Sequence, residues 1–354
     1  MTRSDGPARG GELSPGVARI AVDLLGGDGA PAVVVDGALR ACSADPDLHL
    51  VLVGPREPAG EVLGALPVAD RERVSVTVVD TVVGMAESPL RNIRRETTVR
   101  AAAEAVYTGR ADAMVSAGSS GAAVAASAHV LGRLRGVRRP GLAAQVPTER
   151  GPVLLVDVGV TLDATMLELV QHAVLGTAFA AVALGVTRPR VGLLSIGSEP
   201  GKGDRLRRAV SIALSDIPLP AGGRYVGLVE GFDVPRGGPA DVVVTDGFTG
   251  NILLKGIEGA LGAARARQSE MSALYGTSGK RPHEAAAVLL GVAGDVVVCH
   301  GSASGAEVAD GIALAARLHR DRITPAVASL ADDLLTELSS AGGLTIRDAL
   351  GERS

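Results

Sequence analysis

Short apolar runs alternate with longer amphipathic segments along most of the chain. Most runs are rich in Val, Leu and Ile and end at a glycine or polar residue. They predict strands at 19–23, 49–54, 73–79, 112–115, 153–156, 190–195, 225–229, 240–244 and 295–298. Apolar positions with helical spacing predict helices at about 32–42, 99–107, 122–134, 162–183 and 305–318. This alternation is typical of an α/β fold with a largely parallel sheet and helices on both faces.

The pattern also separates a tail and an arm from the rest of the chain. Residues 1–16 are polar, lack the apolar segment of a signal peptide and are expected to be disordered. Connections are short except at about 256–290, where we expect a helical arm. The uncharged apolar run 173–186 is too short to span a bilayer comfortably and predicts a buried helix.

Composition narrows the class of protein. The 354 residues are 46% hydrophobic but only 2% aromatic, with no Trp, so the core must consist mainly of Ala, Val, Leu and Ile. A net charge of −4 favours neither nucleic acid nor an anionic membrane as a partner. Two cysteines, Cys42 and Cys299, are too few for a disulfide framework, so we expect a reducing, cytoplasmic location.

The segment 245–255 gathers residue types that are rare in this chain. It joins a β-branched run to a segment with helical spacing, so we expect a loop at the carboxyl end of a strand. Ligands bind at this end of the strands in open α/β sheets. It holds Phe248, Asn251 and Lys255, although the chain has only three Phe, two Asn and three Lys. A lysine retained in an arginine-rich chain indicates a use for a compact ammonium group. Chance placement is the alternative.

Other predicted strand ends carry glycine with Ser or Thr and one acid, Lys or His. Because the carboxyl ends of parallel strands meet at one edge, these loops are expected to line a shared cleft. The loop Ser116–Gly121 opens a helix whose N–H groups and dipole suit an anion such as phosphate. An ordinary serine N-cap explains the same residues.

Single residues at these loops have two interpretations each. His300 follows a strand and could donate a proton or bind an anion, or it could simply bond to nearby backbone. Cys299 beside it is better explained as a small buried residue than as a nucleophile. The loop aspartates, such as Asp157, could position ligands or cap helices.

Several cofactor motifs are missing from the sequence. The segment Gly197–Gly203 has three residues where a phosphate-binding P-loop needs four between its glycines, so ATP is not expected. No G-x-G-x-x-G follows a strand, and neither C-x-x-C nor H-E-x-x-H is present. We therefore expect no nicotinamide cofactor and no metal.

Taken in order, the loops resemble those of the PlsX-type phosphate acyltransferases over roughly Val17 to Leu318. The motifs are DLLGGD at 23–28, SAGSSGA at 116–122, DVG at 157–159 with Asp163, IG…GKG at 196–203, DGFTGN at 246–251 with Lys255, LLG at 289–291 and HGS at 300–302. The resemblance implies a fold like isocitrate and isopropylmalate dehydrogenases, with residues 17–354 forming two interwoven lobes. It also implies a homodimer without metal or nucleotide. The implied reaction turns an acyl-carrier-protein thioester and phosphate into acyl phosphate at the start of phospholipid synthesis.

The resemblance and the loop chemistry together give one set of candidate site residues. The candidate catalytic residues are Lys255, His300 and Asn251. The candidate substrate-binding residues are Asp23, Gly26, Gly27, Asp28, Ser116, Gly118, Ser119, Ser120, Gly121, Asp157, Asp163, Lys202, Asp246, Thr249 and Ser302.

The sequence also departs from the resembling family. The family usually has Asn-Thr at Ser119-Ser120, an Asn at Thr161, and a longer, more apolar arm that contacts the membrane. We therefore expect little or no membrane contact and a specialised paralogue. Two alternatives stay open: a non-catalytic acyl-carrier-binding protein, or another enzyme on the same fold, such as a small-acyl coenzyme A phosphotransacylase or a dehydrogenase-like protein.

Overall fold

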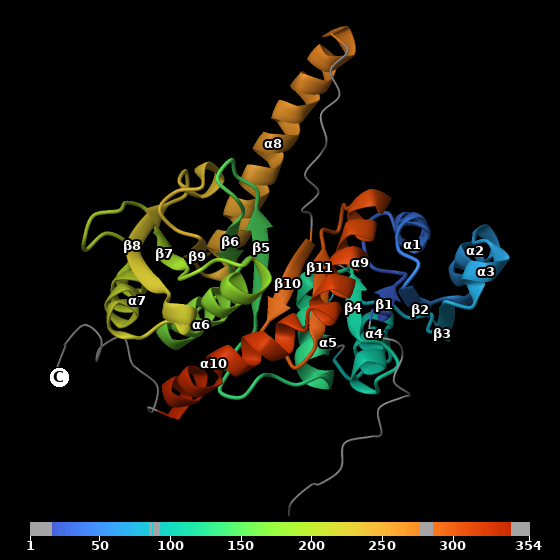
Figure 1. Ribbon diagram of the computed structural model, residues 1–354, viewed down its shortest axis with the longest axis horizontal. Helices are drawn as coiled ribbons and strands as arrows, with labels where there is room; N and C mark the ends of the chain where they lie inside the picture. Colours follow the sequence, from blue (N-terminus) through green and yellow to red (C-terminus); the bar gives the residue numbers. More distant parts are fainter. Residues whose placement is uncertain (1–15, 85–86, 88–92, 276–285, 341–354) are drawn as a thin grey trace, which may run out of the picture. The chain divides into compact units, whose positions relative to one another are not determined.

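The computed structural model describes residues 16–84, 87, 93–275 and 286–340 (Figure 1). These residues form two compact units, which are described separately here. Unit 1 draws on 1–134 and 285–326, and unit 2 on 135–284 and 327–354. Helix α10 (Ile323–Ser340) contains the last of these boundaries. Of the predicted tail 1–16, only Gly16 belongs to the described part.

The strands of unit 1 follow the order β3-β2-β1-β4-β11-β10. Neighbours are parallel, except that β10 runs antiparallel to β11. The strands are β1 (Ala18–Asp23), β2 (Leu48–Gly54), β3 (Val74–Val78), β4 (Ala113–Ser116), β10 (Ala286–Leu290) and β11 (Asp295–Cys299). The inner strands β1, β4 and β11 are almost fully buried, as expected for a parallel sheet covered on both faces.

Two helix pairs cover the sheet of unit 1. On one face α1 (Ala32–Ala44) packs against α9 (Gly305–Arg320), and on the other α4 (Thr98–Tyr107) packs against α5 (Ser120–Val130) (Figure 1). The short helices α2 (Arg56–Ala65) and α3 (Val68–Arg71) lie in the connection from β2 to β3. The helices bury mainly alanine, glycine and valine, which lets them lie close to the sheet and to each other.

In unit 2 the strands of the sheet follow the order β5-β6-β9-β7-β8. Here β5 (Gly141–Val146) is antiparallel to β6 (Val153–Val156), and the others run parallel. They are β9 (Val242–Val244), β7 (Arg190–Ser195) and β8 (Arg224–Glu230). Helix α7 (Arg205–Asp216) and α6 (Met166–Ala183) pack together against this sheet, and 3-10 turns occur at Pro220–Gly222 and Val234–Arg236.

Helix α6 is the core helix of unit 2. It begins with a capping box in which Thr165 and Glu168 each accept a backbone N–H of the other, and it is buried from Met166 to Ala180. Among the described residues, α6 alone is long and apolar enough to cross a membrane, and 83% of it is buried within the protein. The sequence-based expectation of a buried helix in this region is thus confirmed.

Helix α8 (Gly247–Tyr275) starts at the carboxyl end of β9 and extends away from the sheet of unit 2 (Figure 1). It accounts for much of the arm expected at about 256–290. Residues 276–285 lie outside the described part, and the last residues of that range form strand β10 rather than helix. The run Ala286–Leu290 is short and apolar, and its pairing with β11 determines that it is a strand.

All nine predicted strands and all five predicted helices are confirmed, with shifts of a few residues at their ends. The sequence analysis missed β5, β10 and helices α2, α3, α7 and α10. Strand β5 was missed because its sequence, GLAAQV, offers one β-branched residue, so that pairing with β6 rather than local preference makes it a strand.

A substitution at Gly311 tests how closely helix α9 packs against strand β11 in unit 1. A Cβ at this position would overlap the sulfur of Cys299 on β11. We expect Gly311→Ala to lower the free energy of unfolding by about 1–3 kcal/mol, measured by urea denaturation. The matched control is Gly256→Ala on α8, where a Cβ meets no atom within 4 Å. That variant should be neutral or stabilising by up to about 1 kcal/mol. Equal effects at both positions would contradict the packing argument.

Candidate active site

Three loops of unit 1 meet at the carboxyl edge of its sheet. Val22 on β1 is in register with Val115 on β4, and Val298 on β11 is in register with Ser116. The loops that follow these strands therefore start side by side. They carry the predicted residues Asp23, Gly26, Gly27, Asp28, Ser116, Gly118, Ser119, Ser120, Gly121, His300 and Ser302.

A buried carboxylate joins two of these loops. Ser116 Oγ donates to Asp23 Oδ2 at 2.7 Å and accepts the Gly118 N–H at 3.1 Å. The backbone of Gly26 passes so close that a Cβ there would lie 2.7 Å from Gly118 N and 2.9 Å from Ser116 Oγ. Burial raises the pKa of Asp23, although the nearby Thr98 side chain and the hydrogen bonds from Ser116 and the Leu25 N–H oppose that rise. The inward direction of its side chain indicates that Asp23 shapes the loops.

The first turn of α5 presents backbone N–H groups at this edge. Its N-cap residue, Ser119, makes no side-chain capping hydrogen bond, and Ser119, Ser120 and Gly121 are half-exposed. Without a side-chain cap, a helix N-terminus is well suited to an anion. The hydroxyl of Ser119 does not cap the helix, so the geometry favours the anion-binding interpretation of this loop over the ordinary serine N-cap.

The first glycine loop contacts the loop after β11. The Asp28 N–H donates to Gly301 O at 2.7 Å, while the Asp28 side chain is exposed. Gly27 has φ of +110°, and a Cβ there would lie 3.1 Å from Gly301 O and 3.2 Å from Ala117 O. Only glycine fits this conformation and this approach without strain.

The hydrogen bonds of His300 define its tautomer. Its Nδ1 accepts the backbone N–H of Ser302 at 3.2 Å and lies 2.7 Å from Ser302 Oγ. A nitrogen that accepts a backbone N–H carries no proton, so the proton of the neutral ring lies on Nε2. The half-buried imidazole therefore offers a donor at its outer nitrogen. The adjacent Cys299 is buried, which raises its pKa to about 12 and makes it a poor nucleophile.

In unit 2 the carboxylate of Asp157 holds the loop after β6. It is fully buried and accepts four backbone N–H groups, from Leu142, Gly159, Val160 and Thr161, at distances from 2.6 to 3.2 Å. These bonds occupy both oxygens. We therefore infer that Asp157 positions its loop.

The start of α8 rests on this loop. The Gly247 N–H donates to Thr161 O at 2.8 Å, and a Cβ at Gly247 would lie 2.8 Å from Asp157 Oδ2. One turn further, Asn251 Nδ2 donates to Val158 O at 3.0 Å. The amide of Asn251 is thus fixed in direction, and the helix is tied to the Asp157 loop at two points.

Asp246 caps the first turn of α8. Its Oδ1 accepts the Thr249 N–H and its Oδ2 accepts the Thr249 hydroxyl, both at 2.8 Å. Oδ2 also accepts a hydrogen bond from Arg207 on α7. Burial alone would raise the pKa of Asp246, but the bonds from Thr249 and Arg207 outweigh burial and hold this pKa below its ordinary value.

The remaining predicted residues of unit 2 are exposed. The Lys255 and Lys202 ammonium groups make no hydrogen bond or ion pair with other described residues, and the same is true of the Asp163 carboxylate. The structure thus brings Asp246 and Thr249 together and ties Asn251 to the Asp157 loop. Sequence reasoning missed Arg207, although its place three residues after Asp204, at the start of a helix, is a recognisable signal.

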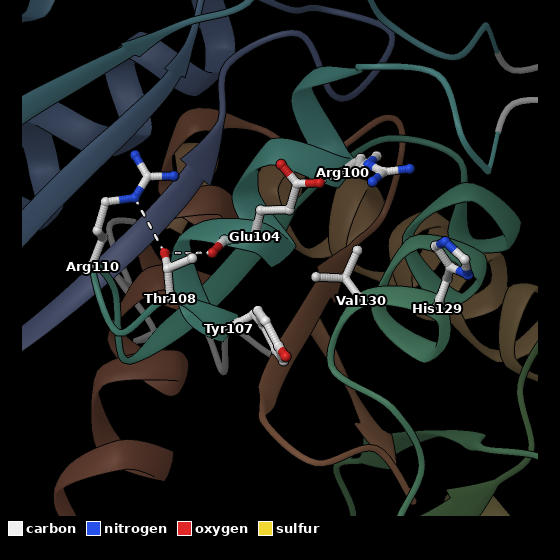
Figure 2. Close-up of a pocket in the computed structure, with 7 residues that line it drawn as sticks. All are labelled: Arg100, Glu104, Tyr107, Thr108, Arg110, His129 and Val130. Carbon is white, nitrogen blue, oxygen red and sulfur yellow. Dashed lines mark hydrogen bonds and ion pairs between the residues drawn. The ribbon is translucent and has the colours of Figure 1, made fainter. Parts of the chain in front are cut away.

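A surface pocket elsewhere in unit 1 contains none of the predicted site residues. It has a volume of about 340 Å³ and is lined by Arg100, Glu104, Tyr107, Thr108, Arg110, His129 and Val130 (Figure 2). They lie along α4 and just after it, and at the carboxyl end of α5, whereas the predicted residues lie near the start of α5. Within the pocket, Arg100 pairs with Glu104 at 2.8 Å and Arg110 Nε donates to Thr108 at 3.2 Å.

The hydrogen bonds of Asp157 predict that two aspartates of unit 2 contribute very differently to the free energy of unfolding. Asp157→Asn would place an NH₂ group against backbone donors, so the free energy of unfolding should fall by about 3 kcal/mol in denaturant titration. Asp163 is exposed, so Asp163→Asn should change the free energy of unfolding by no more than about 0.5 kcal/mol. A small loss at Asp157 would show that these bonds contribute little.

Comparison with solved structures identifies the fold. A phosphotransacetylase from Streptococcus pyogenes matches with a TM-score of 0.57 and 18% identity, over 88% of this chain and 94% of that one. A 4-hydroxythreonine-4-phosphate dehydrogenase from Klebsiella pneumoniae matches with a TM-score of 0.51 and 14% identity, over 88% and 100% of the two chains. At these identities the likeness concerns the fold alone, and it confirms the predicted dehydrogenase-like α/β architecture.

Comparison of sequences identifies the family. The family model described as "Fatty acid synthesis protein" matches residues 18–273. A phosphate acyltransferase from Bacillus cereus strain G9842 is 42% identical over 244 residues, which cover 68% of this chain and 71% of the relative. The corresponding enzyme of Bacillus thuringiensis strain Al Hakam gives the same identity and coverage. The chain belongs to the PlsX-type phosphate acyltransferase family that its strand-end loops indicated.

Proposed function

We propose that this protein transfers an acyl group from the thioester of an acyl carrier protein to inorganic phosphate. A phosphate oxygen attacks the thioester carbonyl carbon, a C–O bond forms and the C–S bond breaks. The products are acyl phosphate and the carrier thiolate, which takes up a proton. The observation that carries the proposal is the family match, since residues 18–273 include every predicted site residue except His300 and Ser302.

The first turn of α5 is the proposed phosphate subsite in unit 1. Its backbone N–H groups are not capped by Ser119, and Gly118 and Gly121 leave room for close approach. Such a subsite binds phosphate through fixed dipoles and needs no metal or nucleotide. The loop is held in shape by the Asp23–Ser116–Gly118 hydrogen bonds, so Asp23 supports the subsite without contacting phosphate.

His300 is the proposed donor to the thioester oxygen. Because its Nδ1 accepts from Ser302, the Nε2–H can donate to the negative charge that develops on the carbonyl oxygen. This role needs a ring in a fixed orientation, and the two contacts with Ser302 provide it.

One exposed face of α8, in unit 2, is the proposed binding surface for the acyl donor. Phe248, Ile252 and Lys255 follow a spacing of four and three residues, so they share one face of the helix. Phe248 and Ile252 are 59% and 56% exposed, and Phe248 is one of only three phenylalanines. Apolar side chains beside an ammonium that pairs with no other described residue suit a hydrocarbon chain that ends in a polar carbonyl group. We therefore place the acyl donor along this face, with Lys255 and Asn251 as polarising groups.

The departures from the resembling family leave the backbone contacts of the site in place. Ser119 stands at the start of α5, where N–H groups rather than a side chain face the anion. Thr161 contributes its N–H to Asp157 and its carbonyl to Gly247. Catalysis is therefore compatible with both substitutions, and a specialised acyl substrate remains our interpretation. The homodimer, the cytoplasmic location and weak membrane contact stay predictions of the sequence.

The reaction can be tested by trapping its product. We expect purified protein, incubated with acyl carrier protein thioester and phosphate, to yield acyl hydroxamate after hydroxylamine is added. Formation should depend on phosphate and should vary with chain length. Product from short-chain coenzyme A thioesters alone would favour the phosphotransacylase alternative. No product from any donor would favour the non-catalytic carrier-binding alternative.

Lys255 is the sharpest single-residue test of the proposed site. We expect Lys255→Ala to lower kcat by about 10²-fold, as for the loss of a preorganised electrostatic group, and Lys255→Arg to fall between it and the wild type. Arg56→Ala removes an exposed cation from α2 and should leave the rate unchanged. Full activity and unchanged phosphate affinity of Lys255→Ala would remove this residue from the proposal.

A further inference from the structure

Arg207 joins the first turns of two helices in unit 2. It is the third residue of α7, and its Nη1 donates to Asp204 Oδ2, the N-cap of its own helix, at 2.7 Å. Its Nη2 donates to Asp246 Oδ2, which caps α8, and reaches Thr249 Oγ1 at 3.4 Å. One guanidinium therefore bridges two carboxylates that each cap the start of a helix.

This bridge connects elements that begin at the same edge of the sheet. Strands β7 and β9 are parallel neighbours, with Leu193 in register with Val244, and α7 and α8 follow them. The side chains of Arg207 and Asp246 are only 12% and 9% exposed, so the Asp246 carboxylate depends on Arg207 to compensate its charge. The rigid fork of arginine can reach both caps at once, whereas a lysine ammonium can approach only one of them closely.

We propose that Arg207 is a positioning residue for catalysis: it locks the first turn of α8 and thereby sets the places of Asn251 and Lys255. This proposal rests on the proposed function for its catalytic consequence. Without Arg207, the Asp246 carboxylate would be left nearly buried with no other cation of the described residues beside it. It would turn outward to water, and the Thr249 N–H and hydroxyl would lose their acceptor. The first turn would fray, and the helix would no longer hold the amide and the ammonium in fixed positions.

The lock can be tested without any enzymatic assay. In hydrogen exchange measured by mass spectrometry, Arg207→Met should speed exchange in peptides covering 246–255 by about tenfold or more, a sign of local opening. Peptides from the core helix α6 should keep their wild-type rate. The matched control is Asp204→Asn, which keeps an oxygen for the Arg207 N–H but loses the carboxylate oxygen that accepts from Arg207 Nη1; it should leave exchange at 246–255 close to wild type. Unchanged exchange at 246–255 in Arg207→Met, or faster exchange throughout the protein, would overturn the proposal.

The catalytic consequence has a separate test. Arg207→Met should lower kcat by about tenfold while KM for phosphate and for acyl donor changes little, and Arg207→Lys should recover part of the loss. In a background that carries both Lys255→Ala and Asn251→Ala, the same substitution should lower the remaining rate by no more than about twofold, because the two groups that Arg207 positions are then absent. A full tenfold loss in that background would overturn the positioning role. If the wild type makes no acyl phosphate, the proposed function fails, and the exchange experiment still decides whether Arg207 locks α8.

Discussion

Backbone N–H groups at the ends of parallel strands need acceptors once the ladder of the sheet stops, and the loops of this protein are built around that need. In unit 2 the buried Asp157 carboxylate takes four of these groups and so determines the path of the chain from β6 toward α6. The start of α8 then packs directly on that loop through Gly247 and Asn251. The start of α8 therefore depends on this buried carboxylate as well as on the contacts of Asp246 with Thr249 and Arg207.

The helices that follow the strands also begin with free backbone N–H groups, and these groups find acceptors in different ways. Helices α6, α7 and α9 begin with side-chain caps from Thr165, Asp204 and Ser304. Helix α5 begins at Ser119 without one, although a serine hydroxyl is present. In unit 1 the buried hydrogen bonds instead stabilise the loop behind the helix, through Asp23 and Ser116. The loop is thus held from behind while Ser119 leaves the first N–H groups of α5 uncapped, which is the arrangement that we propose for phosphate binding.

The sequence predicted the α/β fold and the placement of the candidate residues near strand ends, because β-branched runs followed by glycine are strong local signals. It could not assign a role to each aspartate. Asp157, Asp23 and Asp246 look alike in sequence, yet the first holds backbone amides, the second a serine and the third a helix start with an arginine. Those roles depend on contacts between segments that lie far apart in the chain. Arg207 and strand β5 were missed for the same reason, since their partners Asp246 and β6 decide what they do.

The two cysteines have a practical consequence for experiments on this protein. Both are buried, and burial raises the pKa of Cys42 to about 11 and that of Cys299 to about 12. Alkylating reagents attack the thiolate, so neither native thiol should compete with a new cysteine placed on the surface. The outward face of α8 offers such a place at Gly259, where a side chain would meet no neighbour within 4 Å. A fluorophore or spin label attached there would report on this helix in a chain that keeps both of its own cysteines.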